Sequence, residues 1–188
     1  TPFESTPGIE GEEADFHIEL ELVADAGLIG LPNAGKSSLL NALTNARAQV
    51  GSYAFTTLEP NLGALHGGFI LADIPGLIEG ASTGKGLGHK FLKHIKRTKR
   101  ILHLISLENS AIVETYKTIR KELAQYGQGL DEKEETIILT KTDVTDDKSI
   151  ESARKKLLKY NKDILSITVL DDSSIKILSD EIVKRLRK

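Results

Sequence analysis

Residues 30–37 read Gly30-Leu31-Pro32-Asn33-Ala34-Gly35-Lys36-Ser37, which matches the pattern G-x-x-x-x-G-K-[ST]. An apolar run at 26–29 precedes this stretch, and leucines at helical spacing follow it between residues 36 and 45. The segment is therefore expected to form a strand, a loop and a helix. A loop of this kind turns consecutive backbone N–H groups and the N-terminus of a helix toward a phosphate group. The alternative is a glycine-rich turn that carries a lysine by chance.

Individual residues of this loop have expected roles. Gly30 and Gly35 give the backbone the freedom to curl around a β-phosphate. Lys36 is expected to reach the β- and γ-phosphates as a point charge, and the Ser37 hydroxyl is expected to ligate Mg²⁺. The whole stretch 30–37 is predicted to bind a nucleotide.

Strands and helices alternate along the rest of the chain. Short aliphatic runs predict strands at 69–73, 101–106, 136–140 and 164–169. Helical patterns lie at 90–97, 111–126, 148–160 and 175–186. This order implies right-handed crossovers and an α/β fold, with a mostly parallel sheet and helices on both of its faces.

Composition limits the class of protein. The chain has 188 residues, 39% of them hydrophobic and 28% charged, with a formal net charge of −2. These values fit one globular domain and exclude a uniformly basic nucleic-acid binder. The chain has no cysteine, so it can form neither disulfides nor thiolate metal sites, which fits a reducing cytoplasm. No apolar run approaches the roughly 20 residues that span a bilayer, so no membrane association is expected.

A second motif follows the predicted strand at 69–73. It reads Asp73-Ile74-Pro75-Gly76 and stands at the sheet edge where open α/β proteins bind ligands. The Asp73 carboxylate could hold Mg²⁺ through a water, and the Gly76 N–H could reach a γ-phosphate oxygen. The alternative is an ordinary turn, because Asp and Pro-Gly favour turns.

The segment between these motifs contains Phe55-Thr56-Thr57-Leu58-Glu59. We expect these residues to lie at the nucleotide. A threonine here can place its hydroxyl on Mg²⁺ and its N–H on the γ-phosphate, so that loss of the phosphate releases the segment. Thr57 is the predicted metal ligand, whereas Thr56 fits better as the start of a strand.

Two further elements are expected to recognise the base. Thr140-Lys141-Thr142-Asp143 follows the strand at 136–140, and an aspartate there can accept hydrogen bonds from guanine N1–H and the exocyclic amine. Lys141 can lay its methylene stem along the base. After the last strand, a backbone N–H of Thr168, Val169 or Leu170 is expected at guanine O6. A strand-ending turn and a helix-capping turn are the respective alternatives.

With these motifs the chain resembles the Obg family of GTPases. The matching stretches are 30–37, Phe55 to Leu58 with 60–63, and above all the run DIPGLIEGASTGKGLGHKFLKHIKR at 73–97. The resemblance implies a P-loop NTPase fold of the Ras-like G-domain type over residues 25–188. Residues 1–24 resemble the tail of the glycine-rich domain that precedes this G domain, and the absence of methionine suggests that the chain is a fragment.

The resemblance also implies a function. It suggests GTP and GDP binding with Mg²⁺, slow hydrolysis as a molecular switch, sensitivity to guanine alarmones, and association of a monomer with the large ribosomal subunit and its RNA during late assembly. A nucleotide-occupancy sensor with incidental hydrolysis and a related P-loop ATPase remain alternatives. The basic segment 85–100 could contact RNA phosphates, or it could be a solvated helix face.

Several positions depart from the family pattern. Thr140 replaces the usual Asn, Thr168-Val169 replaces Ser-Ala, and residues 107–110 read Leu-Glu-Asn-Ser where Asp-Ala-Ser is usual. Many GTPases orient the attacking water with a glutamine at the position of Leu77. Hydrolysis is therefore expected to be slow and to rest on Lys36, Thr57 and Gly76. Asn33 either holds K⁺ beside the phosphates or only shapes the loop.

Overall fold

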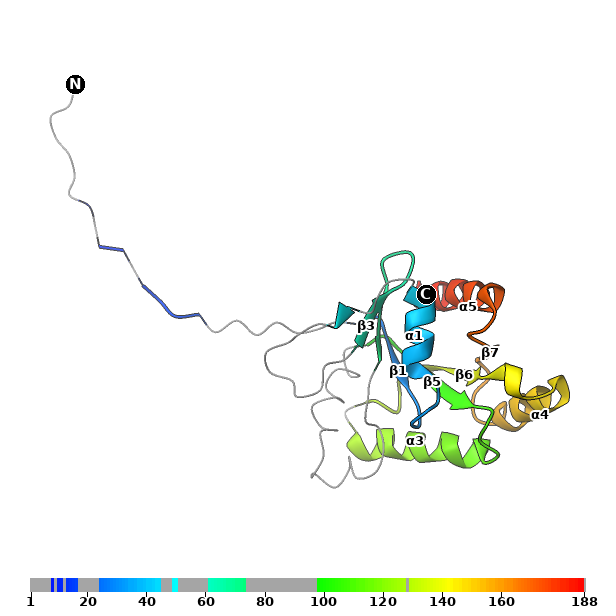
Figure 1. Cartoon of the computed structure of the whole chain (residues 1–188). Helices are drawn as coiled ribbons and strands as arrows, with labels where there is room; N and C mark the ends of the chain where they lie inside the picture. The colour runs from blue at the N-terminus through cyan, green and yellow to red at the C-terminus, as the bar shows by residue number, and fades with distance from the viewer. Residues whose placement is uncertain are drawn as a thin grey trace.

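A computed structural model describes residues 8, 10–11, 13–16, 24–44, 49–50, 61–73, 98–127 and 129–187 (Figure 1). The described strands form one seven-stranded sheet in the order β2-β3-β4-β1-β5-β6-β7. Their bounds are β1 Ala26–Ile29, β2 Gln49–Val50, β3 Asn61–Ala64, β4 Ile70–Asp73, β5 Arg100–Ser106, β6 Glu134–Thr140 and β7 Ile164–Ile167. β4, β1, β5, β6 and β7 pair in parallel, whereas β2 with β3 and β3 with β4 pair antiparallel.

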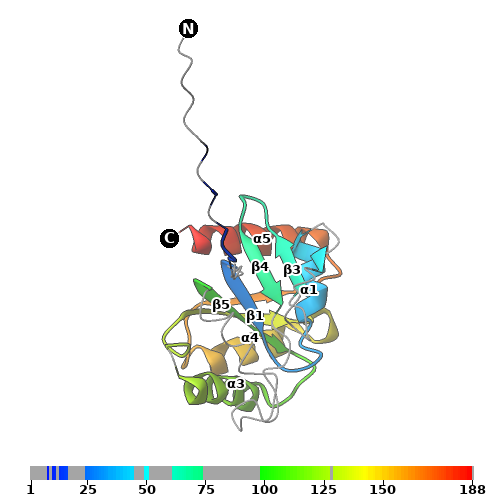
Figure 2. The ribbon, with the colours of Figure 1, turned by 90° about the vertical axis from the view of Figure 1, so that its left-hand side faces the viewer.

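The described helices cover both faces of the sheet. α1 (Lys36–Thr44) and α5 (Asp172–Leu186) lie on one face, and α3 (Ile112–Tyr126) and α4 (Asp147–Leu157) lie on the other (Figures 1 and 2). Successive side chains of β1 point to opposite faces of the sheet, so helices are needed on both faces to bury them. Leu28 packs into the core under α1 and α5, whereas Ile29 packs into the core under α3. β1 is therefore buried on both of its faces, as central parallel strands usually are.

The predicted α/β class is confirmed, and most predicted elements are found with bounds shifted by a few residues. The strand predicted at 164–169 ends at Ile167, and the helix predicted at 148–160 ends at Leu157. The helix predicted at 90–97 lies outside the described residues. No described helix is both long enough and apolar enough to cross a bilayer. The division between residues 24 and 25 stays a prediction.

The antiparallel edge was not predicted. β3 has only one large apolar residue, Leu62, and it contains a glycine, which strands usually avoid. The structure explains the glycine, because a Cβ on Gly63 would lie 2.2 Å from Thr44 Cγ2 of α1. Close packing of α1 against β3, rather than strand propensity, decides this edge.

Candidate functional site: the phosphate loop and the carboxyl ends of β4 and β6

The loop between β1 and α1 has the backbone shape that its sequence predicts. Gly30 has φ +152°, and a Cβ at this position would lie 2.5 Å from the carbonyl oxygen of Leu104 on the neighbouring strand. Gly35 has φ +89° and Asn33 has φ +60°, both in the left-handed region. Glycine supplies two of these conformations without strain, and asparagine tolerates the third. The loop thus curls tightly over the end of the sheet.

Lys36 lies over the loop. Its ammonium donates hydrogen bonds to the carbonyl oxygens of Gly30 at 3.0 Å and Leu31 at 3.2 Å. Burial lowers the pKa of Lys36, and the nearby Asp73 carboxylate partly opposes this shift. A partly desolvated ammonium held at the mouth of a loop of backbone N–H groups is suited to an anionic ligand.

Asp73 and Ser37 meet beside this lysine. The Ser37 hydroxyl donates a 2.5 Å hydrogen bond to Asp73 Oδ2. Asp73 ends β4 and is buried, and no hydrogen-bond partner for its Oδ1 is found in the described part of the chain. A buried carboxylate oxygen without a donor is costly unless a cation or another ligand satisfies it. Carboxylate and hydroxyl oxygens are ligands that Mg²⁺ accepts, so these two residues fit the predicted metal.

Thr140 links the segment predicted to recognise the base to the loop at 30–37. It ends β6, it is buried, and its hydroxyl donates a 2.8 Å hydrogen bond to the carbonyl oxygen of Ala34. This contact gives the departure at Thr140 a structural role, since the hydroxyl fixes the end of β6 against the phosphate loop. The expected juxtaposition of the first and third motifs is therefore observed.

Asp143 lies in a short 3₁₀ helix, η2 (Thr142–Val144), directly after this contact. The Thr168 hydroxyl donates a 2.6 Å hydrogen bond to Asp143 Oδ1, and the N–H of Leu170 donates to the Thr168 hydroxyl at 3.3 Å. The structure thus brings the two predicted base-recognition elements together. Val169 is 38% exposed and Leu170 is 79% exposed, so this turn lies at the surface.

Lys141 has a partner that sequence reasoning missed. Its backbone is left-handed, with φ +60°, and its ammonium forms an ion pair with Glu108 after β5. Glu108 belongs to the stretch 107–110, which departs from the family pattern. That departure marks Glu108 in the sequence but does not indicate its partner. The partner follows only from the pairing of β5 with β6, which places the ends of the two strands side by side.

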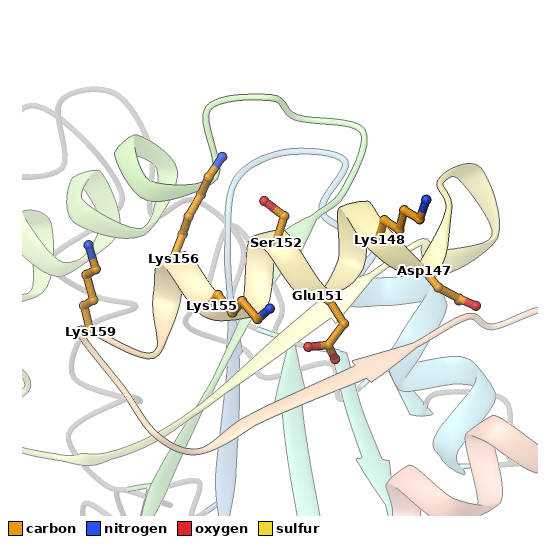
Figure 3. A pocket seen from close by; sticks show the side chains of 7 residues that line it. All are labelled: Asp147, Lys148, Glu151, Ser152, Lys155, Lys156 and Lys159. Atoms are coloured by element: carbon orange, nitrogen blue, oxygen red, sulfur yellow. The ribbon is translucent and has the colours of Figure 1, made fainter.

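The described residues line a hollow beside this framework and a groove on α4. The hollow, of about 320 Å³, adjoins the phosphate loop and is lined by Leu31, Pro32, Asn33, Ala34, Leu104, Ser106, Glu108, Asn109 and Thr115. A more open groove of about 620 Å³ runs along the outer side of α4 (Figure 3). The groove contains no residue of the motifs above, whereas the smaller hollow shares its wall with the phosphate loop. The smaller hollow is therefore part of the candidate site.

Several predicted site residues lie outside the described residues. They are Phe55, Thr56, Thr57, Leu58, Glu59, Ile74, Pro75 and Gly76, together with Leu77 and the basic segment as far as residue 97. Their expected contacts with Mg²⁺ and the γ-phosphate stay predictions. Of the three residues expected to support hydrolysis, only Lys36 has a described position.

The sequence of this chain is similar to those of known proteins. A family model described as "50S ribosome-binding GTPase" matches residues 25–141. GTPase Obg of Microcystis aeruginosa is 42% identical over an alignment that covers all of this chain and 56% of the relative. GTPase Obg of Thermosynechococcus vestitus is 48% identical over 85% of this chain and 49% of the relative. The chain therefore spans about half the length of the curated relatives that it matches.

Solved structures of lower identity share the fold. A GDP-bound NFeoB mutant of S. thermophilus has a TM-score of 0.64 at 21% identity, covering 87% of this chain and 61% of that one. The G domain of the T. maritima FeoB iron transporter has a TM-score of 0.64 at 19% identity, covering 89% of this chain and 100% of that one. At these identities the likeness supports the G-domain fold alone. The matched family model and the Obg relatives, rather than these structures, show that this chain belongs to the 50S ribosome-binding GTPase family and, within it, to the Obg GTPases.

Proposed function

We propose that this chain binds GTP and GDP with Mg²⁺ and hydrolyses GTP slowly, as a molecular switch. One observation carries the proposal: the three motif segments meet at one edge of the sheet. The Ser37–Asp73 hydrogen bond joins the phosphate loop to β4, and the Thr140–Ala34 hydrogen bond joins it to β6. A single ligand that carries both phosphates and a base can therefore touch all three segments.

The phosphates would lie in the curled loop. Its N–H groups and the N-terminus of α1 supply fixed positive dipoles, and Lys36 supplies a formal charge. The hydrogen bonds of Lys36 to Gly30 and Leu31 hold that charge in place before a ligand arrives. Such preorganisation avoids part of the cost of ordering a long side chain on binding.

Ser37 and Asp73 would hold Mg²⁺, with Thr57 as the third predicted ligand. When bound, the ion neutralises charge on the β- and γ-phosphate oxygens. Ser37 lies in the first turn of α1 and Asp73 ends β4, so both ligands stand on rigid elements. Asp73 Oδ1, which is buried and has no hydrogen-bond partner in the described structure, is the atom that a cation or its water would satisfy.

Guanine would be selected by Asp143. Its carboxylate can accept from N1–H and the 2-amino group of guanine, whereas adenine offers neither donor at these positions. The Thr168 hydroxyl orients this carboxylate from one side. The aliphatic stem of Lys141 would cover one face of the base while Glu108 holds its ammonium.

Hydrolysis would be slow because Leu77 cannot hydrogen-bond an attacking water. We propose that Asn33 assists by holding K⁺ beside the phosphates. Asn33 is exposed at the turn of the loop, so its amide oxygen is available to a ligand. Single-turnover GTP hydrolysis in KCl should exceed that in NaCl for the unaltered chain, whereas Asn33→Ala should abolish the difference. Equal rates in the two salts for the unaltered chain would refute the role of K⁺.

The cellular role that we propose is a guanine-nucleotide-dependent step in late assembly of the large ribosomal subunit, in the cytoplasm. Family membership supports it, as does the name of the matched family. Guanine alarmones share the base and β-phosphate and would compete for the same site. Added large ribosomal subunits should accelerate GTP turnover. An unchanged rate together with normal nucleotide binding would instead favour a nucleotide-occupancy sensor.

A further inference from the structure

The segment 148–162 is strongly basic, although the chain as a whole carries a small net negative charge. It contains six basic residues and one acidic residue, although the formal net charge of the whole chain is −2. The basic residues are Lys148, Arg154, Lys155, Lys156, Lys159 and Lys162. All six are exposed. The segment comprises most of α4 and the turn that follows it.

These six side chains lack ion-pair partners in the part of the chain that the structure describes. Within the described ranges, none of the six basic residues takes part in a salt bridge or a side-chain hydrogen bond. α5 provides the contrast, because Lys184 and Arg185 both pair with Glu181 on the same helix. Charges that only solvated a helix would be expected to alternate in sign and to pair as they do on α5.

Complementing the helix dipole does not explain the pattern. Basic residues stabilise the last turn of a helix, which accounts for Arg154, Lys155 and Lys156. Lys148, however, lies in the first turn, where the dipole disfavours it, and Lys159 lies beyond Leu157, at which α4 ends. The basic surface therefore extends past both limits of the dipole effect.

The shape of this surface suits an extended ligand. Figure 3 shows Lys148, Lys155, Lys156 and Lys159 spread along the length of α4. These four lysines line the open groove of about 620 Å³ and outnumber its two carboxylates, Asp147 and Glu151. Tyr160, which follows the lining residue Lys159 in the sequence, is 45% exposed. From α3, the Lys117 ammonium lies 5.6 Å from the centroid of the Tyr160 ring. The Tyr160 ring also contacts Tyr116, with ring centroids 5.5 Å apart, and it stays partly exposed. Lysines beside a partly exposed aromatic ring are a combination that binds single-stranded nucleic acid.

We propose that the outer face of α4, with Lys117 and Tyr160, binds the phosphate backbone of RNA and stacks one unpaired base on Tyr160. This inference rests on the proposed ribosomal function and names the surface that would serve it. An acidic protein would satisfy the lysines equally well but would gain little from the exposed ring. The groove shares no lining residue with the hollow at the phosphate loop, so the RNA and the nucleotide would use different residues.

The test measures the salt dependence of RNA binding by the full 188-residue chain. The probe is a fluorescent single-stranded RNA, about 12 nucleotides long to match the site sizes of single-strand binders, titrated between about 50 and 200 mM KCl. The triple variant Lys155→Gln, Lys156→Gln, Lys159→Gln should bind on the order of tenfold more weakly, and the slope of log K against log[salt] should fall in magnitude by about 2. Tyr160→Leu should weaken binding several-fold and leave the slope unchanged.

A matched control removes the same charge from the opposite face. The variant Lys176→Gln, Lys184→Gln, Arg187→Gln on and just after α5 should leave both affinity and slope unchanged. An unchanged slope in the α4 triple variant, or equal losses in the two triple variants, would overturn the proposal. So would tighter binding of polyglutamate than of the RNA.

GDP affinity separates this proposal from the proposed function. It should be the same in the unaltered chain and both triple variants. If the unaltered chain did not bind GDP, the proposed function would be refuted, whereas the RNA titrations would still decide the role of α4.

Discussion

Charged side chains at the carboxyl ends of the parallel strands differ from those at the amino ends in how fully they are paired within the chain. At the carboxyl ends of the strands, Asp73 keeps one buried oxygen without a partner in the described structure, and Asp143 is exposed. At the amino ends of β5, β6 and β7, Asp163 binds both Arg100 and Arg185. At the carboxyl ends, carboxylate oxygens are thus left for a ligand, whereas at the amino ends the carboxylate oxygens of Asp163 are paired with arginines of the same chain.

The network at the amino ends is well satisfied. Asp163 accepts hydrogen bonds from Arg100 at 3.2 Å, from the Thr136 hydroxyl at 2.7 Å and from Arg185 Nε at 2.9 and 3.0 Å. Burial raises the pKa of Asp163, but the hydrogen bonds from Arg185 and Thr136 and the charges of both arginines outweigh it and lower that pKa. The hydrogen bond to Asp163 likewise raises the pKa of Arg185.

The difference indicates where function and stability reside. At the amino ends, the polar groups are hydrogen-bonded to one another and connect β5, β6, β7 and α5, so they need no ligand. Polar groups left open at the other edge cost stability until a ligand arrives. Substitutions at the two edges should therefore separate nucleotide binding from folding.

The largest effect is expected from Asp143→Asn. An amide in place of the carboxylate would lose its hydrogen bonds from guanine and could donate to the 2-carbonyl of xanthine. The ratio of GDP to XDP affinity should fall by about 10⁴. Competition of XDP and GDP against a fluorescent GDP analogue measures this ratio. If the substitution left guanine preferred, Asp143 would not be the base-recognition residue.

Lys36→Ala should follow in size. It removes charge-assisted hydrogen bonds worth about 1.5–3 kcal/mol each, so GDP affinity should fall about 100-fold. Because Lys36 is partly desolvated, its removal should leave the free energy of unfolding in urea nearly unchanged. Lys184→Ala serves as a control for charge alone. A GDP affinity within about threefold of the unaltered chain, less than one such hydrogen bond is worth, would contradict the assigned role.

At the opposite edge, Asp163→Asn should show the reverse result. Neutralising the acceptor shared by two arginines should lower the free energy of unfolding by about 1–3 kcal/mol. GDP affinity, measured well below the unfolding transition, should be unchanged. Asp131→Asn, which alters an exposed carboxylate, should change neither quantity. A drop in GDP affinity without a drop in the free energy of unfolding would show that nucleotide binding also depends on the amino ends of the strands.

Acid should reduce the effect of Asp163→Asn. The folded pKa of Asp163 is below its unfolded value, so its stabilisation is complete above that value, about 3.9, and is lost as pH falls through the folded pKa. The gap in unfolding free energy between the unaltered chain and Asp163→Asn should therefore narrow as pH falls below about 4. Urea titrations at a series of pH values from about 7 down to about 3 test this trend, and a gap that widens in acid would contradict it.

The smallest effect is expected from Glu108→Gln. The Glu108–Lys141 ion pair is partly exposed, and such pairs contribute about 0.2–1 kcal/mol. Release of GDP should accelerate by about two- to fivefold, with less difference at about 1 M salt. The same substitution should have no effect when Lys141 is already changed to Met. An equal acceleration in that background would show that Glu108 does not act through Lys141.

Local sequence predicted the parts of the molecule that local chemistry decides. The loop at 30–37, the buried strands β5 and β6 and the strand-end position of Asp73 follow from glycine spacing, apolar runs and the parallel topology. β3 could not be predicted, because its glycine is required by the approach of α1. The pairing of Glu108 with Lys141 and the arginine network around Asp163 join residues distant in sequence, so no local pattern indicates them.

Isothermal titration calorimetry of the 188-residue chain tests the convergence of the three motif segments most directly. GDP should bind to one site, more tightly with Mg²⁺ than with EDTA, and ADP should bind at least about 100-fold more weakly than GDP. Absence of Mg²⁺-dependent GDP binding, or equal affinities for GDP and ADP, would contradict a shared site for phosphate, metal and guanine.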